Sequence, residues 1–308
     1  MAKKEDKDLM ESGAKVKLGT SDKIIRGFGY VFLTFYSVCC IIPFIIIVST
    51  SFTSESVIRA EGVQFLPKDI TLTAYDMVTK SGGIWWSYLV TILLTAVGTG
   101  VGLSIIAMTG YALQRKDFPF RNGISFFIYF TSLFQAGLAP YYLLMTQTYH
   151  LKDNYLAVLL PLLMSPWLII LMKNFVKSIP HEITESGKID GAGDMRIFVS
   201  LILPMLKPAL ATIGLFLALG YWNEWYQSSL FLSSRVAVKP LQFTLYEIVN
   251  KTDALKNSVA GQFINLADIP QESVKMANAV LATGPIVLLY PFVQKYFISG
   301  ITVGAVKG

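Results

Sequence analysis

This chain contains six long apolar stretches, which constrain its fold more than any other feature. Inside a bilayer only helices and closed barrels can satisfy every backbone hydrogen bond, and a helix needs roughly 20 apolar residues to cross. Six runs approach that length: residues 27–50, 84–108, 123–138, 155–172, 209–226 and 276–294. We therefore predict an all-α polytopic membrane protein with about six transmembrane helices. Prolines inside the fourth and sixth runs predict bends in those helices.

The composition supports this interpretation. Only 15% of the 308 residues are charged and the mean hydropathy is +0.53, whereas soluble domains carry about 25% charged residues. The net charge of +6 comes from basic residues that flank the apolar runs, which indicates contact with anionic lipid and not with nucleic acid. Cys39 and Cys40 are adjacent within an apolar run, so they predict neither a disulfide framework nor a metal site.

Lysine and arginine counts in the connecting segments predict the orientation of the chain. With the N-terminus inside, the inner segments hold 17 basic residues and the outer segments hold 9, although the outer segments are longer in total. We therefore predict a cytoplasmic tail over residues 1–26 and a transmembrane domain over residues 27–308, with both termini in the cytoplasm. Two long outer loops, 51–83 and 227–275, would then face a soluble partner outside the cell. The alternative for each loop is a solvated cap over the helices.

The polar segment 178–196, between the fourth and fifth runs, has the pattern of two helices joined by a sharp turn. Ser178 is a candidate N-cap, and residues 181–188 are predicted to form a short polar helix. Residues 190–193, with the sequence DGAG, break that helix because glycine permits the positive φ of a tight turn. A second helix is predicted to begin near Asp194 and to lead into the fifth run. This loop is more ordered than a linker requires.

Several positions in and after this loop form a pattern: Glu185-Ser186-Gly187, Asp190-Gly191-Ala192, Phe198, Leu203-Pro204 and Lys207-Pro208. The pattern resembles the EAA loop of ABC importer permeases, which is a coupling helix that sits in a groove of the ATPase subunit. This sequence departs from the family because Ser186 and Gly187 replace the usual two alanines. Both residues are small, so close packing against a partner is retained, although glycine weakens a helix by roughly 1 kcal/mol relative to alanine.

The resemblance implies a contact surface for the ATPase within this loop. Its expected members are Glu182, Glu185, Ser186, Gly187, Asp190, Gly191 and Ala192. We expect Glu185 to bind a basic residue of the ATPase, because charge-assisted hydrogen bonds are directional and suit force transmission. We expect Gly191 to set the turn and Asp190 to cap or brace it. The alternative is that Glu185 and Asp190 only keep the loop soluble.

Other segments resemble carbohydrate-uptake permeases, in particular the aldouronate and polysaccharide type. They are Ala112-Leu113-Gln114-Arg115, Asn223 within YWNEW, KPLQFTLYEIV, PQESVKMANAV and the ending GITVGAVKG. The resemblance implies one permease subunit of a maltose-type oligosaccharide importer in a bacterial plasma membrane. The implied partners are a second, related permease in a heterodimer, two ATPase copies, an extracellular sugar-binding protein and membrane lipid.

Polar side chains at membrane depth are candidates for the path of the transported sugar. The candidates are Gln135, Trp222, Asn223, Glu224 and Trp225. Aromatic faces suit the C–H surface of a sugar, and nearby amides or carboxylates suit its hydroxyl groups. The alternative for the cluster at residues 222–225 is an aromatic belt at the membrane interface, with Asn223 bonded to a neighbouring helix. In maltose-type relatives the substrate pocket can also lie mainly in the partner permease.

The chain carries none of the patterns that would make it an enzyme. It has no GxxxxGK[ST] motif to hold ATP, and its two histidines, His150 and His181, are isolated. We expect no catalytic residue, no cofactor and no metal site, with ATP hydrolysis on a separate chain. The alternatives are an ABC permease for a peptide or amino acid, a secondary transporter and a membrane enzyme. A secondary transporter needs coupling-ion carboxylates near the midplane, which the apolar runs almost lack.

Overall fold

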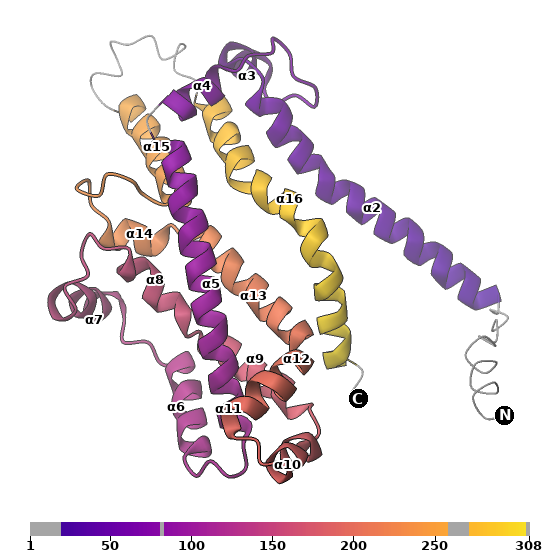
Figure 1. The fold of residues 1–308 in the computed structure, drawn as a ribbon. Coiled ribbons are helices and arrows are strands. Elements are labelled where there is room, and N and C mark those ends of the chain that lie inside the picture. The colour runs from indigo at the N-terminus through magenta and orange to yellow at the C-terminus, as the bar shows by residue number, and fades with distance from the viewer. Residues whose placement is uncertain (1–19, 81–82, 258–270, 306–308) are drawn as a thin grey trace.

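A computed structural model of the protein describes residues 20–80, 83–257 and 271–305, with the side chains of the last helix described as far as Leu288. The protein is 78% helical and the described residues contain no strand, which confirms the all-α prediction (Figure 1). Most of the predicted tail 1–26 and part of the predicted loop 227–275 lie outside the described residues.

The helices form an elongated bundle around α5 (Ile84–Gln114), as Figure 1 shows. Helix α5 packs against α9 (Pro166–Lys177) and α13 (Lys207–Trp222), while α16 (Glu272–Ala305) packs against α2 (Thr20–Ser51). One end of the bundle carries the short helices α3 (Glu55–Glu61) and α4 (Thr73–Lys80), together with the end of α15 (Leu241–Asn257) and the first turn of α16. The opposite end carries α10 (His181–Ile189), α11 (Asp194–Ile197) and α12 (Leu203–Met205).

Among the described residues, three helical segments are long and apolar enough to cross a membrane: Lys23–Ser51, Ile84–Gln114 and Leu156–Lys177. Two bent helix pairs bring the number to as many as five if each pair is one span. The sixth predicted run, 276–294, lies within α16, and its side chains beyond Leu288 lie outside the described residues. The apolar side chains of α2 are exposed along most of its length, as expected of a surface that meets lipid or another membrane helix.

The predicted third and fifth runs are not the straight helices that hydropathy suggested. Helix α6 (Arg121–Leu133) stops early, and α7 (Leu138–Leu143) with the π-helical turn η1 (Leu144–Thr148) continues at 113° to it. Gly137, with φ of 91°, permits this change of direction. Helix α13 ends at Trp222, and α14 (Tyr226–Phe231) starts after a break of three residues. The windows 123–138 and 209–226 therefore each contain a break.

The fourth run is interrupted beside its second proline. Helix α8 (Leu156–Leu163) ends three residues before Pro166, which opens α9 at a position where its missing N–H costs no helical hydrogen bond. The run ends at Lys177, beyond the predicted residue 172.

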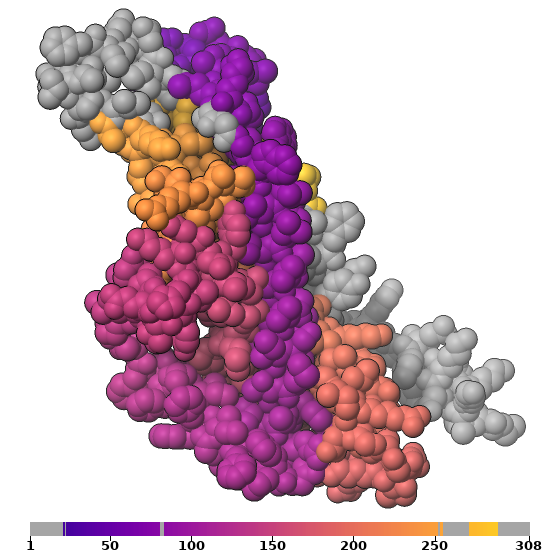
Figure 2. Space-filling model, turned by 60° about the vertical axis from the view of Figure 1, so that its left-hand side comes forward, coloured from indigo at the N-terminus to yellow at the C-terminus, as the bar shows by residue number. Residues whose placement is uncertain are grey.

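Small residues allow α5 to lie very close to its neighbours. A Cβ atom at Gly98 would come within 2.3 Å of the Tyr221 ring on α13, and one at Gly110 would come within 2.6 Å of Met172 on α9. The main apolar core lies around the C-terminal half of α5 and includes Ile106 and Ile213. A second core joins α4, α15 (Leu241–Asn257) and α16 at the other end of the bundle. Helix α5 thus connects both ends of the molecule and runs along the length of the face that Figure 2 shows.

Candidate functional site

The segment 178–196 forms the two helices and the turn that its sequence predicts. Helix α10 spans His181–Ile189, and α11 (Asp194–Ile197) continues through the π-helical turn η2 (Phe198–Ile202) and α12 (Leu203–Met205) to α13. Gly191 has a φ of 73°, so the expected left-handed turn is present. The predicted N-cap role of Ser178 is wrong, because its hydroxyl donates to the carbonyl of Phe175 (2.7 Å) and closes α9, and Pro180 precedes α10.

The turn after α10 is held by backbone hydrogen bonds. The N–H of Asp190 donates to the carbonyl of Ser186 (3.0 Å), and the N–H of Ala192 donates to that of Gly187 (2.9 Å). Gly187 itself is buried, and a Cβ atom there would lie 3.0 Å from both Ile197 and Leu201. The small side chain at Gly187 therefore serves packing inside the loop, where the sequence suggested packing against a partner.

The other face of this loop is open to solvent. Glu182, Ser186 and Asp190 are exposed, and the Glu185 side chain is 64% exposed with an oxygen 4.0 Å from His181 Nε2. Two apolar side chains share the exposed surface: Ile189 is 86% exposed and Met195 is 65% exposed. Exposed apolar groups among acidic ones are typical of a surface that another protein covers.

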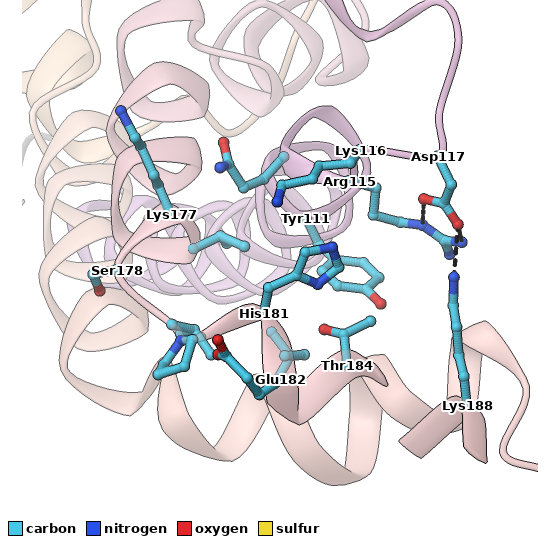
Figure 3. A pocket seen from close by; sticks show the side chains of 15 residues that line it. Tyr111, Arg115, Lys116, Asp117, Lys177, Ser178, His181, Glu182, Thr184 and Lys188 are labelled. Carbon is cyan, nitrogen blue, oxygen red and sulfur yellow. Dashed lines mark hydrogen bonds and ion pairs between the residues drawn. The ribbon is translucent and has the colours of Figure 1, made fainter. Parts of the chain in front are cut away.

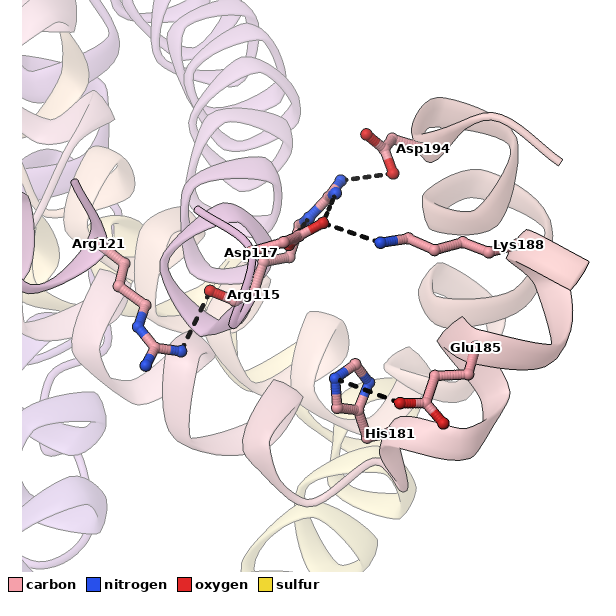
Figure 4. A network of polar contacts seen from close by, with 7 residues as sticks. All are labelled: Arg115, Asp117, Arg121, His181, Glu185, Lys188 and Asp194. Atoms are coloured by element: carbon pink, nitrogen blue, oxygen red, sulfur yellow. Dashed lines mark hydrogen bonds and ion pairs between the residues drawn. The ribbon is translucent and has the colours of Figure 1, made fainter. Parts of the chain in front are cut away.

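A polar cluster ties this loop to the end of α5 (Figure 4). We call Arg115, Asp117, Lys188 and Asp194 the Arg115 cluster. Arg115 Nη1 lies 2.6 Å from Asp194 Oδ1, and Arg115 Nε donates to Asp117 Oδ1 (2.8 Å), with a second contact from Nη2 to Asp117. Lys188 Nζ, at the end of α10, donates to Asp117 Oδ2 (2.8 Å).

Charge pairing fixes the ionisation of this cluster. Hydrogen bonds from Arg115 and then Lys188 hold the pKa of Asp117 far below its ordinary value. The hydrogen bonds from Arg115 to Asp117 and Asp194 raise the pKa of that guanidinium further above its ordinary value. These pairs could not be predicted from sequence spacing, because Asp117 and Lys188 are 71 residues apart. Only the resemblance of residues 112–115 to carbohydrate-uptake permeases pointed to Arg115.

A cavity of about 460 Å³ opens between α10 and the ends of α5 and α9 (Figure 3). Its lining includes Tyr111, His181, Glu182 and Thr184. The Tyr111 hydroxyl is buried and has no hydrogen-bond partner within the described part of the chain. Among the described residues there is no group of three His, Cys, Asp or Glu side chains that could hold a metal ion.

The predicted path residues at positions 222–225 lie at the break between α13 and α14, where Trp222 ends α13 and the other three form the break, and their side chains differ in exposure. Glu224 is buried and accepts hydrogen bonds from the backbone of Gln227 and from Ser228 Oγ (2.6 Å), so it caps the start of α14. Trp222 is also buried, and its Nε1 donates to the carbonyl of Ala282 on α16 (3.0 Å). These two side chains are occupied by contacts within the protein.

Asn223 and Trp225 are the more accessible members of this group. Asn223 is exposed, and its Oδ1 accepts a hydrogen bond from Gln242 Nε2 (3.3 Å). The indole of Trp225 is 42% exposed and lies with its ring centroid 4.8 Å from that of Tyr246. An amide and an aromatic face are thus available at the break in this span.

Gln135 lines a separate cavity of about 550 Å³ at the α6–α7 bend. The same cavity is lined by Tyr226 and Gln227 of α14 and by Tyr141, whose hydroxyl donates to Gln227 Oε1 (2.9 Å). The structure therefore brings Gln135 to the residues that directly follow Trp225. Sequence reasoning missed Tyr141 and Gln227, because only the bend at Gly137 brings α7 to α14.

Comparisons with known proteins place the chain among transport proteins. It is 34% identical over 279 residues to the polygalacturonan/rhamnogalacturonan transport system permease protein YtcP of Bacillus subtilis, covering 91% of this chain and 96% of that protein. It is 35% identical over 268 residues to protein LplC of the same organism, covering 87% of this chain and 90% of that protein. No family model matches the chain.

A solved structure has the same fold. It is the crystal structure of a bacterial ABC transporter involved in the import of the acidic polysaccharide alginate. The TM-score is 0.75 and the sequence identity is 32%, with 91% of this chain and 98% of the solved chain covered.

Proposed function

Because the chain belongs to the permease subunits of binding-protein-dependent ABC sugar importers, we propose that its segment 178–196 is the coupling loop that docks on an ATPase. The observation that carries this proposal is the exposed acidic and apolar face of an otherwise well-packed loop. Permeases of this family work with a second permease, an ATPase and a sugar-binding protein, and they are transport subunits and not enzymes.

The contact with the ATPase is assigned to the exposed residues of the loop. Glu185 and Glu182 supply the negative charge, and Ile189 supplies an apolar anchor. Ser186 and Asp190 lie on the same open side, whereas Gly187, Gly191 and Ala192 give the loop its shape. A basic residue of the ATPase would complete a charge-assisted pair with Glu185.

The complex is proposed to contain this chain in a heterodimer with a related permease, together with two ATPase copies. The exposed apolar face of α2 is available to lipid or to the second permease. The described end of α16 lies toward the end of the bundle that carries α10 (Figure 1). That arrangement supports cytoplasmic termini, and it leaves the predicted outer loops 51–83 and 227–275 to the sugar-binding protein.

The substrate class is proposed to be oligosaccharides that contain uronic acids. Two of the similar proteins are named for acidic polysaccharides, polygalacturonan in one case and alginate in the other. Within this chain, Asn223, Trp225 and Gln135 are the proposed sugar contacts, joined by Tyr226 and Gln227. Trp222 and Glu224 stabilise the break through buried hydrogen bonds to Ala282 and Ser228.

Uptake measurements test the substrate class. The importer is reconstituted in liposomes with its cognate binding protein, and uptake of trigalacturonate, an alginate trisaccharide and maltotriose is compared. We expect ATP-dependent uptake of at least one of the two uronate sugars and little uptake of maltotriose. Uptake of maltotriose alone would overturn the uronate assignment without affecting the coupling loop.

The coupling assignment has its own test. Glu185→Ala should lower sugar uptake and co-purification of the ATPase, while Glu61→Ala, which removes an exposed carboxylate at the other end of the bundle, should not. A Glu185→Ala importer with normal ATPase binding and normal uptake would contradict the role given to Glu185.

A further inference from the structure

Arg115 stands at the end of α5, where it contacts both sides of the coupling-loop turn. Its guanidinium binds Asp194 at the start of α11 (2.6 Å) and Asp117 (Nε to Oδ1, 2.8 Å), and Asp117 in turn accepts from Lys188 at the end of α10 (2.8 Å). The turn at Gly191 lies between Lys188 and Asp194 in the sequence. The end of α5 is thus joined to both helices that flank the turn (Figure 4).

Neighbouring residues of α5 and α6 also hold Arg115 in place. The Arg115 side chain is 19% exposed, and its Cζ lies 5.9 Å from the centroid of the Tyr111 ring one turn earlier in α5. The Tyr111 ring packs on Phe198 of η2, with 5.1 Å between centroids. The carbonyl of Arg115 accepts a hydrogen bond from Arg121 at the start of α6 (3.3 Å). A charge held on several sides in a partly buried place keeps its direction better than a free surface charge.

Helix α5 is the element through which a displacement of the loop can reach the translocation path. It packs against α8, α9 and α13, and α13 ends at the break that holds Asn223 and Trp225. A rigid helix transmits a displacement of one end to its whole length, whereas the backbone of the loop alone would absorb it.

We propose that Arg115 is a positioning residue that transmits movement of the coupling loop to α5 during ATP-driven transport. The inference rests on the proposed function of the loop, and it goes further because it gives a role to a residue outside the proposed contacts with the ATPase and the sugar. The planar guanidinium can bind Asp117 and Asp194 at the same time, which a lysine ammonium cannot match in geometry. The rival explanation is that the Arg115 cluster only stabilises the folded loop.

The test separates transmission from stability. The complete importer in nanodiscs is assayed for ATP hydrolysis with and without its cognate binding protein. That protein is preincubated with a mixture of trigalacturonate, an alginate trisaccharide, arabinotriose and maltotriose, so the outcome does not depend on which sugar is carried. The variants are Arg115→Gln, Arg115→Lys, Asp194→Asn and the matched control Lys116→Gln, which removes the neighbouring exposed charge.

We expect Arg115→Gln to lose roughly fivefold or more of the stimulation by binding protein, the lower end of typical coupling effects. Basal hydrolysis and co-purification of the ATPase should stay at the wild-type level, and Lys116→Gln should behave as wild type. Arg115→Lys and Asp194→Asn should fall between wild type and Arg115→Gln. If Arg115→Gln does not accumulate in the membrane, Asp194→Asn, which removes one contact only, carries the same test.

Two outcomes would overturn the inference. Normal stimulation in Arg115→Gln would show that movement reaches α5 by another route. Parallel loss of ATPase binding, basal hydrolysis and stimulation would assign the Arg115 cluster a purely structural role. A wild-type complex that neither holds an ATPase nor responds to its binding protein would instead refute the proposed function of the loop.

Discussion

Helices α16 and α5 are each anchored at one end by charged side chains, but the two anchors are built differently. Glu55, on α3, is 8% exposed and accepts hydrogen bonds from the backbone of Glu272 (3.3 Å) and Ser273 (3.2 Å) and from Ser273 Oγ (3.0 Å). We call this contact the Glu55 cap. It satisfies the free N–H groups at the start of α16 from a residue more than 200 positions earlier.

The Arg115 cluster holds α5 by ion pairs whose acidic partners are largely in solvent. The side chains of Asp117 and Asp194 are 46% and 57% exposed. Exposed ion pairs contribute roughly 0–1 kcal/mol and re-form easily, whereas a buried carboxylate that loses its partners costs much more. The Glu55 cap is therefore costly to break, whereas the Arg115 cluster combines several individually weak contacts that together keep the direction of the guanidinium.

Removal of the Glu55 cap should give the largest effect on stability. Glu55→Ala leaves the N–H groups of Glu272 and Ser273 without their acceptor. We expect the free energy of unfolding to fall by about 3 kcal/mol, since hydrogen bonds to charged groups contribute about 1.5–3 kcal/mol each. Thermal unfolding of the purified complex measures this loss of stability. Glu61→Ala is the control, because its exposed carboxylate pairs with exposed Lys68 (2.6 Å). Equal shifts for the two variants would contradict the assignment.

Acidification should weaken the same cap by a smaller amount. Burial alone would raise the pKa of Glu55, but hydrogen bonds from the backbone of Ser273, Glu272 and Gln271 outweigh it and lower the pKa below the ordinary 4.5. A lowered pKa in the folded state stabilises the fold above the unfolded-state pKa, and this contribution is lost as the pH falls through the folded-state pKa. The stability difference between wild type and Glu55→Gln should therefore be constant from pH 7 to about pH 5 and shrink below it. A difference that grows on acidification would break the prediction.

Loss of Arg115 should change stability less than loss of the Glu55 cap. We expect Arg115→Gln to lower the free energy of unfolding by less than about 1 kcal/mol, because the carboxylates it pairs with are largely exposed. That difference should diminish between about 0.1 M and 1 M salt, where the Debye length falls from roughly 10 to 3 Å. The Glu55→Ala difference should respond less to salt, because the Glu55 carboxylate is buried and bound mainly by backbone N–H groups and Ser273, although Arg59 Nε also lies 3.3 Å from it. A salt-insensitive Arg115→Gln difference would show that the cluster is as firmly held as the cap.

The smallest effect is expected at Gly187, inside the coupling loop. Alanine gains roughly 1 kcal/mol of helix propensity over glycine, but its Cβ would lie 3.0 Å from Ile197 Cγ1 and Leu201 Cδ1, which must move slightly. These opposed terms should leave Gly187→Ala within about 1 kcal/mol of wild type, while Gly187→Val should be clearly worse. Unfolding of both variants by heat provides the measurement, and equal stability of valine and alanine would show that this site is not tightly packed.

The class of this protein follows from its amino-acid sequence alone. The hydrophobic effect and the need to satisfy backbone hydrogen bonds are enough to interpret apolar runs of about bilayer length. These runs predicted an all-α membrane fold, which the structure confirms. The short helix after Pro180 and the turn at Gly191 were also predictable, because proline and glycine act through local backbone geometry. The resemblance of the loop and of the flanking segments identified the sugar importers, and the similar proteins confirm that family.

Tertiary contacts, in contrast, determine which polar side chains are exposed and which are bound within the protein. Glu224 and Asn223 are neighbours in the sequence, yet one caps α14 and the other is exposed. The roles of Glu55 and Arg115 had no local signal in the sequence. Glu55 binds Ser273, which lies 218 positions later, and Arg115 binds Asp194, which lies 79 positions later. Local propensity fixes the direction of the backbone over a few residues, but a buried charge takes its role from partners that arrive only when distant helices pack together.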